Sequence, residues 1–179
     1  MRAEITDFLR TILETTWKPP STGVIKVNTD AAIIPPAAVG FGGVMGDHMG
    51  DVVVAMCMKM EGRFEVDVIE AMAMRHALQV TMESGFSSVC LETDCFKLYS
   101  HLSKATVTTN AFGRIVNDIL MLARSCQACS FSFVKRSGNK VAHSLAKLCT
   151  TYFDFTVWLE EYPHDVSELV LADLSQIDV

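Results

Sequence analysis

Three acidic residues lie at positions where an apolar or neutral residue would be usual. Asp30 closes the apolar stretch V-N-T-D-A-A, Glu70 lies within the apolar V-I-E-A-M-A, and Asp94 follows the apolar-rich V-C-L-E-T. Each has an ordinary explanation: Asp30 as a turn former, Glu70 as a solvated acid near a helix start, and Asp94 as a helix N-cap. Taken singly, none of the three indicates a site.

Taken together, the three acids predict a metal site. The ends of two strands and the start of a helix can meet at one edge of a sheet. Three carboxylates gathered there would repel one another unless cations neutralised them. Oxygen ligands without a cysteine or histidine cluster favour Mg²⁺, with Mn²⁺ as an alternative. Such ions suit phosphoryl hydrolysis, in which one ion activates water and another stabilises the leaving oxygen.

The elements that must position these acids follow from hydrophobic periodicity. The predicted order is three strands, a helix, a strand, two helices, a strand and a helix, which is typical of a mixed sheet covered by helices. The predicted strands are residues 24–30, 39–45, 51–59, 88–92 and 130–135. The predicted helices are residues 67–84, 94–102, 110–124 and 139–148.

The ends of the chain differ from its middle. Residues 4–14 have the apolar spacing of a short amphipathic helix, which W-K-P-P at Trp17 interrupts. Residues 154–179 hold seven acids and no base. We therefore expect an N-terminal helix within residues 1–16, a domain over residues 17–153 and an acidic C-terminal tail over residues 154–179.

Composition excludes several classes of protein. Of the 179 residues, 50% are hydrophobic and 20% are charged, which favours a packed core over disorder. No run of 18 apolar residues is present, so no membrane span is expected. The acids Glu4, Asp7 and Glu14 argue against a secretory signal. Six cysteines are too few for a disulfide scaffold and favour a reduced compartment, the cytoplasm or the nucleus.

The net charge of −6 conceals a basic segment. Residues 119–153 contain five bases and no acid. A local basic face that contacts phosphates is therefore compatible with the acidic total. The alternative is a solvated helix surface with no partner.

Several motifs along the chain resemble those of a known family. They are W-K-P-P, V-N-T-D-A, G-F-G-G-V-M-G-D, I-E-A-M-A-M-R-H-A-L, L-E-T-D-C and V-K-R-S-G-N-K-V-A-H-S-L-A-K. In order and spacing they are similar to the ribonuclease H-like domain, of the type 1 ribonuclease H family, found in plant reverse-transcriptase-like proteins. The resemblance covers about residues 17–150, and the flanking segments resemble what remains when such a domain is cut from a longer retroelement protein.

The resemblance implies an α/β, ribonuclease H-like fold, with a five-stranded mixed sheet in the order 3-2-1-4-5 and helices on both faces. It also implies metal-dependent endonucleolytic hydrolysis of the RNA strand in RNA–DNA hybrids, with double-stranded RNA or DNA as other partners. Asp30, Glu70 and Asp94 match the first three catalytic, metal-binding carboxylates. The residues expected near the nucleic acid are Lys135, Arg136, Asn139 and Lys140.

The sequence departs from the family pattern at the fourth carboxylate. The family motif A-D-x-L-A reads A-H-S-L-A here, with His143 at the catalytic position. Neutral imidazole is a poor Mg²⁺ ligand but acceptable for Mn²⁺, and a protonated His143 would repel a metal. The loop of residues 136–139 also lacks the histidine that many active members carry. We expect catalysis to be weak and to prefer Mn²⁺, unless His143 is a helix-surface residue with no catalytic role.

Two other functions remain open. One is a catalytically inactive domain of the same fold that binds nucleic acid. The other is a protein-interaction module that uses the N-terminal helix or the third strand, which is apolar on both faces. Cleavage that depends on metal separates the enzyme from both alternatives, and salt-dependent binding without cleavage identifies the first of them.

Overall fold

The computed structural model describes residues 15–177, so the helix expected over residues 4–14 lies outside the described part. Among the described residues, no helix has both the length and the apolar character of a bilayer span. The strands are β1 (Ile25–Ile34), β2 (Ala38–Gly46), β3 (Val52–Glu61), β4 (Ser88–Thr93), β5 (Ala128–Phe133) and β6 (Phe155–Leu159). The helices are α2 (Val66–Glu83), α3 (Phe96–Ser103), α4 (Ala111–Ser125), α5 (Lys140–Leu148) and α6 (Ser167–Leu174), with 3₁₀ turns η1 (Arg136–Gly138) and η2 (His164–Val166).

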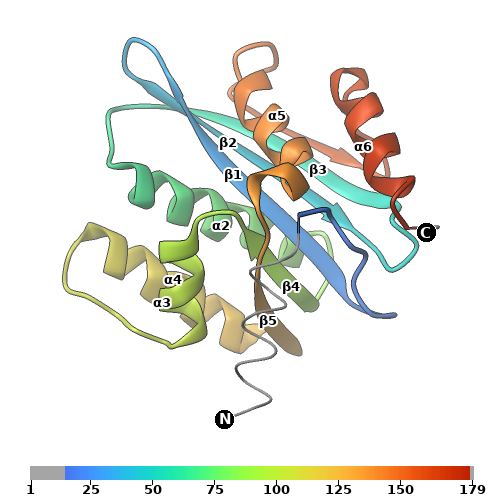
Figure 1. Cartoon of the computed structure of the whole chain (residues 1–179). Helices are drawn as coiled ribbons and strands as arrows, with labels where there is room; N and C mark the ends of the chain where they lie inside the picture. Colours follow the sequence, from blue (N-terminus) through green and yellow to red (C-terminus); the bar gives the residue numbers. More distant parts are fainter. Residues whose placement is uncertain (1–14, 178–179) are drawn as a thin grey trace.

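The strands form one mixed sheet in the order β5-β4-β1-β2-β3-β6. β1, β4 and β5 are parallel, whereas β2, β3 and β6 join by antiparallel pairing. Helices α2, α3 and α4 cover one face, and α5 and α6 cover the other (Figure 1). The expected α/β class, the helices on both faces and the relative order of the first five strands are confirmed.

The number of strands was predicted wrongly. The structure has a sixth strand, β6, which pairs antiparallel with β3 in a segment that was expected to be an acidic tail. Valines from η2 and α6, Val166 and Val170, are buried in a cluster with Val141 and Leu145 of α5. Residues 155–174 are thus packed against the sheet and α5. Because β3 is hydrogen-bonded to both β2 and β6, it is not an edge strand of the sheet.

Glycines in β2 let α5 lie directly on the sheet. A Cβ atom on Gly42 would lie 2.2 Å from the carbonyl oxygen of Ala142, and one on Gly40 would lie 2.0 Å from that of Ala146. No side chain fits in either space, so the backbone of α5 approaches β2 closely. Gly42 is the partner of Asp30 in the register of β1 and β2. This packing brings the first turn of α5 beside Asp30.

Candidate active site

The register of two parallel strands brings Asp30 and Asp94 together. Thr29 of β1 pairs with Thr93 of β4, and each aspartate is the next residue along its chain. Asp30 is fully buried within β1, which continues to Ile34, so the expectations that it ends the strand and that it is a turn former were both wrong. Asp94 is not the N-cap of α3, because that position is Cys95.

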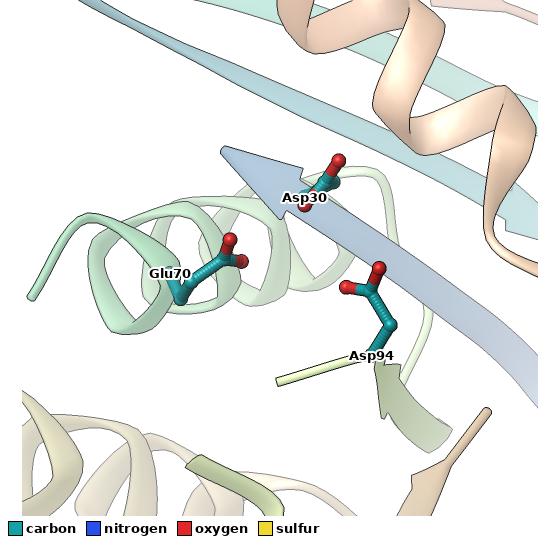
Figure 2. Close-up of side chains that lie close together, drawn as sticks. All are labelled: Asp30, Glu70 and Asp94. Carbon is teal, nitrogen blue, oxygen red and sulfur yellow. The ribbon is translucent and has the colours of Figure 1, made fainter. Parts of the chain in front are cut away.

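Glu70 completes the cluster from α2. It lies in the second turn of that helix and is only 7% exposed, so it is not a solvated acid. Its carboxylate points toward Asp30 and Asp94 (Figure 2). Ligand oxygens of the three residues all lie within 4.8 Å of one another. The structure therefore brings together the three acids that the sequence nominated as metal ligands.

Burial and mutual repulsion change the protonation of the cluster. Burial, with the charges of Asp30 and Asp94, raises the pKa of Glu70 to about 9. Burial and the Asp30 charge also raise the pKa of Asp94, although Arg136 and a hydrogen bond from Asn139 act in the opposite direction. A metal-free cluster therefore holds a proton at neutral pH. A bound cation would relieve the same repulsion.

The cluster fits a divalent cation. Asp30 Oδ1 and Glu70 Oε2 are buried, and no donor group of another described residue reaches them, so without metal only a proton held between the two carboxyls can satisfy them. Buried carboxylate oxygens normally have a donor or a cation as a partner. Three carboxylates without sulfur ligands match the preferences of Mg²⁺ and Mn²⁺. Asp30, Glu70 and Asp94 are thus the residues that would hold the ion.

The raised pKa of Glu70 predicts how stability depends on pH without metal. The unfolded chain releases this proton near the ordinary value of 4.5, whereas the folded chain holds it up to about 9. The folded state binds more protons across this window, so stability falls as pH rises, by at most about 1.4 kcal/mol per pH unit for one proton. Urea unfolding of the metal-free protein at several pH values should show a shallower decline for Glu70→Gln. Equal slopes for the two proteins would contradict the assignment.

His143 lies inside the site. Its Nδ1 atom is 2.5 Å from Asp30 Oδ2 and 2.8 Å from Nη2 of Arg136. The residue that the sequence motif places at the position of a fourth carboxylate therefore contacts the carboxylate of Asp30. His143 lies in the first turn of α5 with its side chain 24% exposed, and its ring faces the carboxylate cluster.

The four residues expected near nucleic acid differ in exposure. Lys135, Arg136 and Lys140 are exposed, and Arg136 faces the carboxylates. Asn139 is instead buried, and its amide nitrogen donates to the Thr29 carbonyl oxygen and to Asp94 Oδ1, at 2.9 and 3.3 Å. Asn139 therefore links Asp94 to β1. The Asn139 side chain is buried and does not face the solvent, where a nucleic-acid phosphate would lie.

A buried polar network behind the cluster was missed from the sequence. Trp17 Nε1 donates to Asn28, and Asn28 Nδ2 donates to both Glu92 and Asn139. Glu92 is also paired with Lys26, at 3.1 Å. The signal was present, because Asn28 and Glu92 are polar residues inside otherwise apolar strands, as Asp30 is. Their hydrogen bonds tie β1, β4 and the residue before α5 to one another.

An aromatic cluster beside Asp94 was also missed. The rings of Phe96, Tyr99 and Phe133 lie 5.5–6.2 Å apart between centroids, and Phe96 is 47% exposed. The usable signal was the spacing of Phe96 and Tyr99, which places both on one face of the helix after Asp94. Surface aromatic rings can stack on nucleobases.

Comparison with protein families identifies one match. The model of the family described as reverse transcriptase-like matches residues 28–149. This region contains Asp30, Glu70, Asp94 and His143. No curated protein matches the chain at the threshold applied.

Solved structures share the fold. Ribonuclease H1 from the halophilic archaeon Halobacterium salinarum is 22% identical with a TM-score of 0.66, covering 72% of this chain and 98% of its own. The N-terminal RNase H domain of a Mycobacterium tuberculosis protein is 18% identical with a TM-score of 0.63, covering 69% and 91%. LC11-RNase H1, solved with an RNA/DNA hybrid, is 18% identical with a TM-score of 0.62, covering 69% and 94%. These likenesses establish a ribonuclease H-like fold.

Proposed function

The chain belongs to the reverse transcriptase-like family, and on that basis we propose that it is a metal-dependent endoribonuclease that hydrolyses the RNA strand of RNA–DNA hybrids. The observation that carries this proposal is the cluster of Asp30, Glu70 and Asp94, whose ligand oxygens lie within 4.8 Å of one another. The solved complex of LC11-RNase H1 with an RNA/DNA hybrid supports the substrate class.

The chain's own residues divide the work at this site. Asp30, Glu70 and Asp94 would hold Mg²⁺ or Mn²⁺, and the bound ion would supply an activated water and stabilise the leaving oxygen. Asn139 orients Asp94 by the hydrogen bond described above. His143 would offer an imidazole in place of a fourth carboxylate, which favours Mn²⁺ over Mg²⁺. The catalytic set is therefore Asp30, Glu70, Asp94 and His143.

Lys135, Arg136 and Lys140 supply positive charge for the phosphate backbone at the solvent side of the site. The RNA 2′-hydroxyl is the group by which the enzyme would distinguish the strand that it cuts. The exposed ring of Phe96 would add a stacking or apolar contact beside Asp94. The substrate face thus combines basic and aromatic side chains around the carboxylates.

Replacing Lys135 with glutamine is expected to weaken hybrid binding and reduce its salt dependence. Loss of one phosphate contact should reduce the steepness of the fall of log K with log salt, making the negative slope smaller in magnitude by about 0.9. Fluorescence anisotropy at several salt concentrations measures this slope. Lys104→Gln removes an exposed lysine at the end of α3 and serves as the control. An unchanged slope for Lys135→Gln would remove that residue from the interface.

The proposed activity is tested with an RNA–DNA hybrid labelled on the RNA strand. The protein is incubated in Mg²⁺, in Mn²⁺ or with a chelator, and Asp30→Asn is compared with the wild type. Asp118→Asn is the matched control, because Asp118 is exposed and paired with Arg75 away from the cluster. We expect internal cleavage of the RNA strand, stronger in Mn²⁺, that the chelator and Asp30→Asn abolish. Absence of cleavage in both metals by folded protein would refute the proposal.

One observation favours a second candidate, a nucleic-acid-binding domain without activity. His143 occupies the catalytic position of a carboxylate and contacts Asp30. If the hybrid binds in a salt-dependent manner and is not cut in either metal, this second function holds.

A further inference from the structure

The solvent side of the carboxylate cluster carries a positive charge that belongs to the protein. Nη2 of Arg136 lies 3.9 Å from Asp30 Oδ2, and Nη1 lies 3.9 Å from Asp94 Oδ2. Nη2 also lies 2.8 Å from Nδ1 of His143. One guanidinium group therefore faces two of the three carboxylates and the histidine.

Glu70 has no ion pair among the described residues, although the charge of Arg136 also acts to lower its pKa. Asp30 Oδ1 and Glu70 Oε2 are the oxygens of the cluster that no donor group reaches from the described part of the chain. The two oxygens of Asp30 differ: Oδ2 lies 3.9 Å from Arg136 Nη2 and 2.5 Å from His143 Nδ1, whereas Oδ1 is buried without a hydrogen-bond donor among the described residues. Arg136 is thus paired with Asp30 and Asp94, and the buried oxygens Asp30 Oδ1 and Glu70 Oε2 remain available to a metal ion.

We infer that Arg136 acts as a built-in cation that takes the place of a second metal ion, so that the three carboxylates bind one divalent ion. This inference rests on the proposed function and specifies how many ions its site takes. Three ionised carboxylates and one guanidinium carry a net charge of −2, which a single divalent ion neutralises. A second divalent ion would approach the side chain of Arg136 and be repelled by it.

The backbone around Arg136 is fixed, so the fold sets the point from which its side chain reaches the carboxylates. Gly138 of the same turn is buried, and a Cβ atom there would lie 2.5 Å from Val134 Cγ2 and 3.1 Å from the Trp17 nitrogen. The Ser137 hydroxyl donates to the Thr15 carbonyl oxygen. The Arg136 side chain itself is 64% exposed, so it retains access to solvent.

The number of bound ions tests the inference without an activity assay. Mn²⁺ is titrated into protein free of nucleic acid, with calorimetry and the paramagnetic resonance of free Mn²⁺ as readouts. We expect one ion for the wild type, and two for Arg136→Gln with the first bound about three- to tenfold more tightly. Arg136→Lys, which keeps the charge, should bind one ion. Lys135→Gln controls for loss of a nearby charge that does not contact the carboxylates, and should also bind one.

Each other outcome has a definite meaning. Two ions bound to the wild type, or one bound to Arg136→Gln, would overturn the inference and leave the proposed ribonuclease intact. An equal gain in Mn²⁺ affinity for Arg136→Gln and Lys135→Gln would show that any nearby positive charge has the same effect, and it would also overturn the inference. Failure of the wild type to bind Mn²⁺ would refute both the inference and the metal dependence of the proposed function. A thermal melt of each variant verifies that it is folded.

Discussion

Asp94→Asn is expected to reduce cleavage of the RNA strand by more than about a hundredfold. Mutating a residue that only hydrogen-bonds to a metal ligand already costs up to about a hundredfold in activity, and Asp94 is proposed as a ligand itself. The amide has the shape of the carboxylate and can still accept the hydrogen bond from Asn139 Nδ2. The change removes one negative charge and one anionic ligand, and the cluster needs both to bind a divalent ion. The loss should therefore come from the chemistry and not from the fold.

Single-turnover cleavage of a labelled hybrid in Mn²⁺ measures this effect, and hybrid affinity is measured separately in the absence of metal. The metal-free variant should be at least as stable as the wild type, because a repulsive charge near Asp30 has been removed. Asp118→Asn should cleave at the wild-type rate. Wild-type cleavage by Asp94→Asn would show that the carboxylate cluster is not the active site.

His143→Asp is expected to increase cleavage in Mg²⁺ by at least about tenfold, equivalent to about 1.4 kcal/mol in the barrier. The Nδ1 atom of His143 lies 2.5 Å from Asp30 Oδ2, so the new carboxylate would stand beside the first one. A fourth carboxylate supplies the oxygen ligand that Mg²⁺ prefers over imidazole. The gain should be smaller in Mn²⁺, which accepts both ligands.

The same substitution predicts a change in stability that does not depend on activity. Without metal, an extra carboxylate next to Asp30 should lower the melting temperature, and added Mg²⁺ should restore it. His48→Asp, in the exposed turn between β2 and β3, is the matched control. No gain in cleavage from folded His143→Asp would count against the view that this histidine limits catalysis.

The convergence of Asp30, Glu70 and Asp94 was predictable because it follows from strand and helix order. The residues before Asp30 and Asp94 form parallel strands of one sheet, and parallel neighbours direct equivalent positions to the same place. Glu70 stood out because it interrupted the buried stripe of a helix. Hydrophobic periodicity and secondary-structure propensity are local properties of the sequence. They therefore locate helices and strands and the unusual residues inside them.

Other features depend on contacts that are distant in sequence. β6 contains the β-favouring F-T-V-W-L, but the seven acids of residues 154–179 obscured it. Among the described residues, Asp154, Glu160, Glu161, Asp165 and Glu168 are exposed, and only packing distinguishes such a solvated surface from an unpacked tail. Asn139 was expected to contact phosphate because it lies in a basic loop. Its burial follows from partners on β1 and after β4, which the loop sequence does not specify.

The pairing of β6 with β3 determines which strand is exposed at this edge of the sheet, where strands of another molecule could pair. β3 is a ten-residue strand with apolar side chains, and an open edge of that kind would template strand addition between molecules. β6 covers that edge and is itself a poor template, since it has five residues and is followed by Glu160 and Glu161. The C-terminal region thus puts a short strand followed by two acids at the sheet edge where the longer, more apolar β3 would otherwise lie. It lies outside residues 28–149, which the family model matches, so this edge strand is supplied by sequence beyond that match.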